Sequence, residues 1–470
     1  MKSRNKYLLK NTLIFTIGNF ASKFISFFLI PIYTHVLSTA DYGIIDLIST
    51  ICLVLVPLLS FNIAESIMRF GLDKKEEYST KILVIANKSF IVSIIIGLIL
   101  FPVLLLIKSI SKFSILIYLY FVSLVGTQIY LAVLKGQEKL KVYTIGNVLD
   151  TFLIAICNII LLIGLKKGIE GYFIAYIISN IIVLIYAFIL SGAYKEINKK
   201  MDVDLYKKMV KYSVVLIPTS FMWWIMNSSD RIMVNSMVST SANGIYAISY
   251  KLPTLISSII GIFTQAWLFS AISEKNSSDS ELYTNKVFKM LFIFSSFICI
   301  SLLLVTKPFM KFYVSDSFYE GWKYVPFLAI GVVFQSLATF ISTSYNVYKD
   351  NKGFLYSGIT GAIVNIVLNF ILIPKFKVYG AALATCVSYI IVYIYRLIDT
   401  RKYVKIHTNK AYFYITYFIF IVSLVFMYLD FYVSELLLLI NLLILTILFY
   451  KDLLLILKKI VGRGKNEFSK

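Results

Sequence analysis

The feature that most constrains this chain is a succession of long apolar runs separated by short charged or turn-forming segments. A run of about 20 apolar residues is long enough to cross the hydrocarbon core of a bilayer as an α-helix. The runs form three groups, of six, six and two. We place them at about 13–36, 44–64, 82–107, 113–134, 143–165, 171–192, 210–238, 245–271, 287–306, 324–347, 354–373, 379–398, 411–429 and 433–457. The sequence therefore predicts an all-α integral membrane protein with about 14 transmembrane helices.

Composition excludes a water-soluble protein and gives no sign of an active site. Hydrophobic residues make up 59% of the chain, charged residues 15%, and the mean hydropathy is +0.82, whereas soluble domains have about 45–50% apolar and about 25% charged residues. The four cysteines stand singly inside apolar runs, and the two histidines belong to no metal-binding or catalytic pattern. A glycine-rich phosphate loop is also absent from the sequence. We expect no cofactor, no metal and no enzymatic activity.

Charge is distributed unevenly among the predicted loops. The chain has 46 Lys and Arg against 24 Asp and Glu, a formal net charge of +22. Most of the cations fall in loops on the side that both termini share, which the positive-inside rule assigns to the cytoplasm. Opposite loops are very short, for example around 38–43, 239–244 and 429–435. The positive charge therefore indicates topology, and we expect no nucleic-acid partner.

Two series of six spans resemble each other. Residues 167–175 match 377–384 at the start of the sixth span of each series, and 41–44 match 243–246 between the first two spans. Parallel repeats of this kind are a feature of transporters, although chance similarity among Gly-rich loops is the alternative. The predicted organisation is a first six-helix bundle at 1–195, a cytoplasmic linker at 196–211, a second bundle at 212–400, and two further spans with a basic tail at 401–470.

Polar and charged residues inside the predicted spans are the candidates for a site, because each buried charge costs about 2.5–3.5 kcal/mol on insertion scales. In the first span, Asn19 and Lys23 are four residues apart and share a helical face. In the eighth, Lys251 and Gln265 belong to a polar stripe. Snorkelling of Lys251 to the membrane surface is the competing explanation for its position.

The seventh span carries a second polar face. Asn227, Arg231 and Asn235 are spaced at i, i+4 and i+8, and Asp230 points about 100° away from Arg231. Asp230 is either a coupling carboxylate or a structural counter-ion, and the structural role is slightly favoured. For the other charges in or near the spans, a structural or interfacial role is at least as plausible as a functional one. These residues are Asp46, Glu65, Arg69, Lys88 and Asp150.

Several short motifs carry a resemblance that covers essentially the whole chain. They are Pro31-Ile32-Tyr33-Thr34, Asp41-Tyr42-Gly43, Pro218, Asp230-Arg231, Gly244-Ile245-Tyr246, Asn365 to Asn369, Ile373-Pro374, Gly380-Ala381-Ala382 and Ala384-Thr385. With these motifs the chain resembles the polysaccharide-unit flippases (O-antigen, capsule or teichoic type) of the multidrug/oligosaccharidyl-lipid/polysaccharide (MOP) exporter superfamily.

The resemblance implies a V-shaped pair of six-helix bundles, similar to multidrug exporters of the superfamily, around a cavity that opens alternately to either side. The implied cargo is a polyprenyl-pyrophosphate-linked oligosaccharide, moved from the cytoplasmic to the outer leaflet of a bacterial plasma membrane for cell-surface polysaccharide synthesis. Cations in relatives correspond by position to Lys23 and Lys251, and Arg231 is a third candidate for the pyrophosphate. Glycan polymerases or assembly proteins are the implied protein partners.

Three alternatives stay open at the level of sequence. A peptidoglycan-precursor flippase would carry a similar lipid-linked cargo. A multidrug exporter would be expected to present carboxylates to cationic drugs, whereas the deepest charges here include Lys23, Arg231 and Lys251. A membrane polymerase or ligase would need catalytic residues, commonly in a large outer loop. The sequence also leaves open whether an ion gradient or consumption of the product drives transport.

Overall fold

The computed structural model describes residues 22–73, 76–107, 110–275, 277–407 and 410–454. Throughout these ranges the regular structure is helical, with no strand. Two compact units divide the chain, Met1–Gly244 (unit 1) and Ile245–Lys470 (unit 2). The division of the chain that the sequence predicts, two six-helix bundles joined by a linker at 196–211, stays a prediction.

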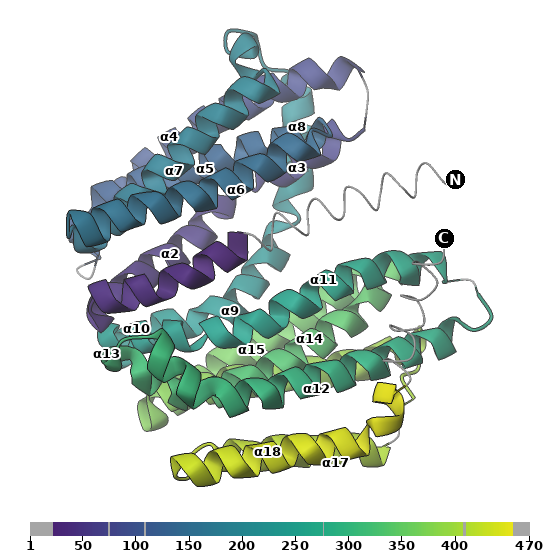
Figure 1. Ribbon diagram of the computed structural model, residues 1–470. Helices are drawn as coiled ribbons and strands as arrows, with labels where there is room; N and C mark the ends of the chain where they lie inside the picture. The colour runs from purple at the N-terminus through teal and green to yellow at the C-terminus, as the bar shows by residue number, and fades with distance from the viewer. Residues whose placement is uncertain (1–21, 74–75, 108–109, 276, 408–409, 455–470) are drawn as a thin grey trace, which may run out of the picture. The chain divides into compact units, whose positions relative to one another are not determined.

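The first described helix of unit 1 spans residues 22–36, and α2 to α9 follow it (Figure 1). Its elements are α2 (Thr39–Leu59), α3 (Ile63–Gly71), α4 (Glu76–Leu106), η1 (Ser111–Phe113), α5 (Ser114–Gly136), α6 (Leu140–Asn158), η2 (Ile159–Gly164, a π-helix), α7 (Gly168–Ser191), η3 (Ala193–Glu196), α8 (Val203–Val214) and α9 (Ile217–Met237). The next helix, α10 (Thr240–Ser249), contains the division between the units.

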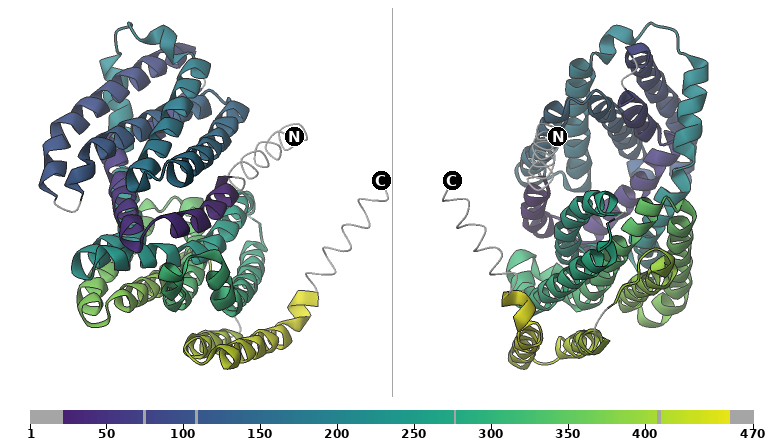
Figure 2. Two further views of the ribbon diagram at one scale, coloured as in Figure 1. Left: turned by 60° about the vertical axis from the view of Figure 1, so that its left-hand side comes forward. Right: turned by 90° about the vertical axis from the view of Figure 1, so that its right-hand side faces the viewer.

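Unit 2 contains the rest of the helices. They are α11 (Lys251–Ser273), α12 (Ser280–Tyr313), α13 (Asp316–Tyr319), η4 (Glu320–Lys323), α14 (Val325–Tyr348), α15 (Asn351–Phe376), α16 (Val378–Asp399), η5 (Thr400–Lys402), α17 (Lys410–Phe426) and α18 (Phe431–Leu448). Figures 1 and 2 show α17 and α18 side by side, and α18 packs along α12.

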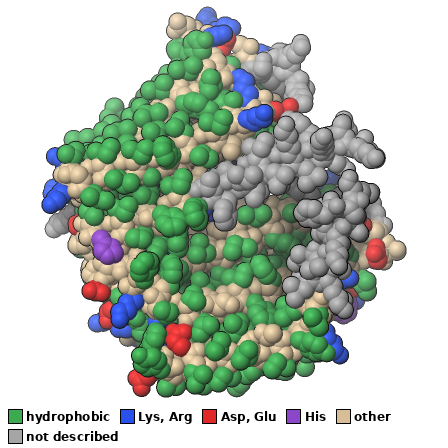
Figure 3. Space-filling model, viewed as in Figure 1, with side chains coloured by type: hydrophobic (Ala, Val, Ile, Leu, Met, Phe, Trp, Pro, Cys, Tyr) green, Lys and Arg blue, Asp and Glu red, His purple; other side chains and the backbone are tan. Residues whose placement is uncertain are grey.

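The expected membrane-spanning architecture is confirmed. Among the described residues, 12 helices are long and apolar enough to cross a membrane. The two remaining sequence-predicted spans are the first, which is described only from residue 22, and α17, which at 17 residues is shorter than the others. Hydrophobic side chains cover much of the face in Figure 3, and charged side chains lie mostly toward its margins. Such a surface suits a bilayer rather than water.

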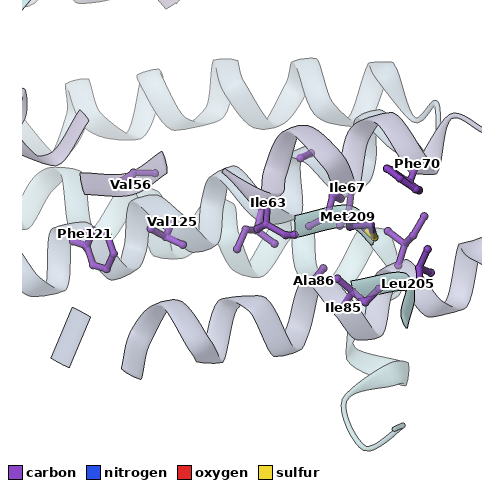
Figure 4. Packing of buried hydrophobic residues seen from close by; sticks show 14 residues of the cluster. Val56, Ile63, Ile67, Phe70, Ile85, Ala86, Phe121, Val125, Leu205 and Met209 are labelled. Carbon is purple, nitrogen blue, oxygen red and sulfur yellow. The ribbon is translucent and has the colours of Figure 1, made fainter. Parts of the chain in front are cut away.

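The core of unit 1 is built by apolar stripes of α2 to α5 and α8 (Figure 4). Ile63, Ile67 and Met209 are each at most 1% exposed and lie at its centre. The helices α3 and α5 approach closely because both carry glycine where they meet. A Cβ added to Gly71 would lie 2.7 Å from the Cα of Gly136. Small residues at such crossings allow the backbone contact on which helix packing in membranes depends.

Unit 2 packs around α14, which lies between α11, α12 and α16. Its core contains a guanidinium group, since Arg396 of α16 is only 1% exposed. The Arg396 Nε donates to Ser357 Oγ at 3.0 Å, and Nη1 donates to the Ala338 carbonyl at 3.0 Å. The guanidinium carbon also lies 5.3 Å from the centre of the Phe354 ring. Arg396 thus joins α14, α15 and α16.

The loop between α14 and α15 is fixed by a carboxylate. Asp350 precedes α15 and accepts a hydrogen bond from the Gly353 N–H at 2.9 Å, while Lys402 Nζ lies 3.1 Å from its other oxygen. The Gly353 N–H and the Lys402 ammonium stabilise the ionised form and lower the pKa of the Asp350 carboxyl to about 2. This N-cap therefore depends on ionised Asp350.

Candidate functional site

Within unit 1, the beginning of α2 crosses the beginning of α10 at a pair of glycines. A Cβ on Gly43 would lie 1.9 Å from the Thr240 carbonyl oxygen, and a Cβ on Gly244 would lie 2.0 Å from the Thr39 carbonyl oxygen. No side chain larger than hydrogen fits at either position without displacing backbone. The two segments overlap those that the sequence matched with each other, and the matched glycines lie against one another: a Cβ on Gly43 would be 3.1 Å from the Gly244 nitrogen.

Polar groups hold this crossing together. Thr39 Oγ1 and Ser241 Oγ are 2.5 Å apart, and Asn243 Nδ2 donates to the Gly43 carbonyl at 3.0 Å. Ser38 fixes the start of α2, because its hydroxyl accepts from the Asp41 N–H and the Asp41 carboxylate accepts from the Ser38 N–H. We call residues 38–46, 231 and 239–244 the α2–α10 contact.

A buried ion pair lies in the α2–α10 contact. Arg231 Nη1 of α9 donates to Asp46 Oδ1 of α2 at 2.8 Å, and the two side chains are 18% and 8% exposed. Asn243 Nδ2 lies 3.4 Å from the other Asp46 oxygen. The indole N–H of Trp224 donates to the Thr50 carbonyl at 2.9 Å, a further tie between α9 and α2. Removing either member of such a pair would leave a poorly solvated charge.

Sequence reasoning singled out Arg231 but missed its counter-ion. It placed Asp46 only among charges of probable structural use, and Asp230 was the carboxylate considered beside Arg231. In the structure, Asp230 is fully buried and its Oδ1 accepts from the Arg231 backbone N–H at 2.9 Å. The only local signal for Asp46 is its position two residues after the segment 41–44, which the sequence matched with 243–246.

Apart from those on α9, the other candidates in the described residues lie on two helices. Asn19 lies outside the described residues. Lys23 is exposed on the helix over 22–36, Lys251 is half-buried at the start of α11, and Gln265 is exposed further along α11. Lys23 thus belongs to unit 1, and Lys251 to unit 2.

The two asparagines of the predicted polar face on α9 have different surroundings. Asn227 Nδ2 donates to the Trp223 carbonyl of its own helix at 2.6 Å. Asn235 is half-buried, and its Oδ1 is buried without a hydrogen-bond donor among the described residues. Arg231 is therefore paired with Asp46 of another helix, whereas the Asn227 amide is hydrogen-bonded to the backbone of α9 itself.

Unit 2 contains a buried amide and hydroxyl cluster that the sequence showed only as a motif. Asn369 Nδ2 donates to Asn365 Oδ1 at 3.0 Å, and Asn365 Nδ2 lies 3.4 Å from Thr385 Oγ1. The Tyr250 hydroxyl lies 3.5 Å from the same Thr385 oxygen. Asn365, Asn369 and Thr385 are fully buried. No group of three or more His, Cys, Asp or Glu side chains suited to a metal occurs in the described part of the chain.

Comparison with known proteins identifies a family and a relative of similar sequence. A family model described as "Polysaccharide biosynthesis protein" matches residues 8–275. An uncharacterized membrane protein of Methanocaldococcus jannaschii is 23% identical over 419 residues, which is 84% of this chain and 99% of the relative.

Solved structures with a similar fold include transporters. The lipid II flippase MurJ in an inward closed conformation has a TM-score of 0.74 at 17% identity, covering 94% of this chain and 100% of that one. A multidrug resistance MATE family transporter of the MOP superfamily, in an inward-facing conformation, has a TM-score of 0.64 at 13% identity, covering 82% and 94%. These likenesses confirm the expected fold.

The family model covers more than half of the chain, and the fold is shared with transporters across most of its length. The protein therefore belongs to the polysaccharide biosynthesis protein family, and it is a multi-pass membrane protein whose fold is shared with the MurJ flippase and a MATE family transporter.

Proposed function

We propose that the protein moves a polyprenyl-pyrophosphate-linked oligosaccharide from the cytoplasmic to the outer leaflet by alternating access, for the synthesis of a cell-surface polysaccharide. The observation that carries this proposal is the family match over residues 8–275. The span pattern and the absence of any catalytic constellation in the sequence agree with a transport role rather than a chemical one.

Cations on the spans are the proposed contacts for the pyrophosphate. Lys23 and Lys251 lie at positions that the protein does not fully cover, so an anionic group can reach them. Arg231 has its charge balanced by Asp46 in this structure and would contribute only when that pair opens. A diphosphate in a medium of low dielectric needs positive charge close by.

The remaining polar candidates keep secondary proposed roles. Asn19, Asn227, Asn235 and Gln265 are proposed contacts for sugar hydroxyls. Asp230 is the proposed coupling carboxylate, although its complete burial is also what a structural counter-ion would show.

A second cargo deserves a direct test because of one specific observation. The MurJ chain, named as a lipid II flippase, is matched over 94% of this chain with a TM-score of 0.74. The second candidate function is therefore translocation of a peptidoglycan lipid precursor. Both cargoes share a polyprenyl pyrophosphate, so the cations just named would serve either one.

Topology and location are part of the proposal. We propose a bacterial plasma membrane with both termini in the cytoplasm, from the distribution of Lys and Arg, and glycan polymerases or assembly proteins as partners. Cysteines placed at Ser3 and Ser469 would be labelled by an impermeant reagent only after the cells are opened. Labelling in intact cells would refute the assignment.

Reconstitution into liposomes tests the cargo. Fluorescent polyprenyl-pyrophosphate oligosaccharide and fluorescent lipid II are offered separately, with and without an ion gradient, and outer-leaflet exposure is followed by quenching. The Lys23→Gln and Lys251→Gln variants should slow translocation, while Lys311→Gln, an exposed lysine near the end of α12, should not. Faster movement of lipid II would favour the second candidate. Movement of neither cargo under any gradient would refute both.

A further inference from the structure

A cavity of about 660 Å³ lies in unit 2 where α12 meets α17 and α18. It is lined near the first residues of α12 and α17 and just past the end of α18, so it opens at one end of these three helices. The positive-inside assignment places that end at the cytoplasmic surface. Its volume is within the range of about 300–1,000 Å³ that is common for ligand sites.

Three aromatic rings form the inner wall of this cavity. Phe292, Phe413 and Phe449 line it, and each is at most 9% exposed. The centroids of the Phe292 and Phe413 rings are 4.0 Å apart, which joins α12 to α17. The Phe449 ring follows α18, at 6.5 Å from Phe292. The inner part of the cavity therefore suits a hydrocarbon chain.

The rim of the cavity is charged. Lys289 pairs with Asp452 at 2.7 Å, and His407 Nε2 lies 3.0 Å from Glu281 Oε1. Lys286 also lines the cavity, is exposed, and pairs with no carboxylate among the described residues. The Lys289–Asp452 pair is balanced, and Lys286 offsets Glu281, whose histidine partner carries charge only when protonated.

The excess of positive charge at the rim comes from residues next to it in the sequence. Lys405, Lys410 and Lys451 are all exposed and lie within two residues of rim or wall residues. An apolar wall below a cationic rim at the membrane surface is the arrangement that binds an amphiphile with an anionic head group.

We infer that this cavity binds an anionic glycerophospholipid of the cytoplasmic leaflet. The phosphate lies at Lys286, near the exposed Lys405, Lys410 and Lys451, and an acyl chain lies against the three phenylalanine rings. Such a lipid would fill the space between α12 and the two C-terminal helices and so stabilise their packing. This site is distinct from the cations proposed for the cargo, and its occupancy requires no transport.

Thermal unfolding of the full-length protein in detergent micelles tests the inference. Phosphatidylglycerol, phosphatidylcholine, soluble glycerol 3-phosphate and a polyprenyl phosphate are titrated in turn. We expect phosphatidylglycerol to raise the midpoint more than phosphatidylcholine, and glycerol 3-phosphate to leave it unchanged. Lys286→Gln should weaken the apparent affinity for phosphatidylglycerol about fivefold, since one surface lysine contributes about 1 kcal/mol to anionic-lipid binding. Lys286→Glu should weaken it further.

The matched control is Lys311→Gln, which removes an exposed lysine from the same helix at its other end. It should retain the wild-type response to phosphatidylglycerol. Equal shifts of the unfolding midpoint with the two phospholipids would overturn the site, because the binding would then be non-specific. An equal loss of affinity for phosphatidylglycerol in Lys286→Gln and Lys311→Gln would overturn it for the same reason. Tighter retention of the polyprenyl phosphate than of phosphatidylglycerol would also overturn it, and would assign the cavity to the cargo's path.

Discussion

The ion pair between Asp46 and Arg231 should be energetically coupled, and a double-mutant cycle can measure the coupling. The charged atoms are 2.8 Å apart, with the side chains only 8% and 18% exposed. Removing one partner of a buried pair costs about 3–5 kcal/mol. Because Arg231 keeps partial exposure, we expect Asp46→Asn and Arg231→Gln to destabilise the protein by about 2–4 kcal/mol each.

The double variant carries the decisive information. If each single change is costly because it isolates the other charge, then changing both should cost about 2 kcal/mol less than the sum of the two. Denaturant unfolding in detergent micelles, followed by tryptophan fluorescence, gives the free energies. Trp224 is a suitable reporter, since its indole N–H donates to Thr50 on the helix that carries Asp46.

A surface pair provides the control for this cycle. Arg69 and Asp73 also form an ion pair, but their side chains are 53% and 37% exposed. Their coupling should be below about 1 kcal/mol, as for other exposed pairs. Additive costs within about 0.5 kcal/mol for Asp46 and Arg231, or a coupling no larger than that of the control pair, would refute the reasoning.

Three further predictions concern the α2–α10 crossing and two polar sites of unit 2. In a background without native cysteines, Thr39→Cys with Ser241→Cys should form a disulfide that stops translocation until it is reduced; undiminished transport by the oxidised protein would show that the α2–α10 contact does not open. The lowered pKa of Asp350 stabilises the fold above the unfolded-state pKa of about 3.9, and this stabilisation is lost as pH falls toward its folded pKa of about 2; Asp350→Asn should lose that pH dependence of the unfolding midpoint. Arg396→Ala should destabilise the protein by about 2–4 kcal/mol in denaturant unfolding, because it removes hydrogen bonds of a buried charged group and leaves a cavity. Arg401→Ala, which changes an exposed arginine, should alter stability little.

The transmembrane architecture could be predicted because each span is specified locally. A continuous apolar run of sufficient length must be helical in a bilayer whatever its neighbours are. The prediction was less exact where local composition changes. The polar stretch before the seventh span forms α8 and lies nearly continuous with α9, and the thirteenth span is a helix of 17 residues. Neither length follows from hydropathy alone.

The site could be predicted only as a set of residue types. Lys23, Arg231 and Lys251 were identified because charges in apolar runs are costly. The pairing of Arg231 with Asp46 could not be identified, since 185 residues separate them and only the packing of α9 on α2 joins them. The cavity beside Lys286 is likewise formed by α12, α17 and α18, so no local pattern marks it.

The residues at the α2–α10 crossing would suit a contact that opens during the proposed transport. At the crossing itself the residues are small or polar, with Gly43 and Gly244 against the backbone and Thr39, Ser241 and Asn243 donating or accepting hydrogen bonds. Each such bond contributes only about 0.5–1.5 kcal/mol net, because water can replace it when the segments separate. A contact made of large apolar side chains would resist opening, since their exposure costs about 25 cal/mol per Å². Large apolar side chains lie in the core of unit 1, whereas the α2–α10 crossing is made by backbone, hydroxyl and amide groups that water can solvate.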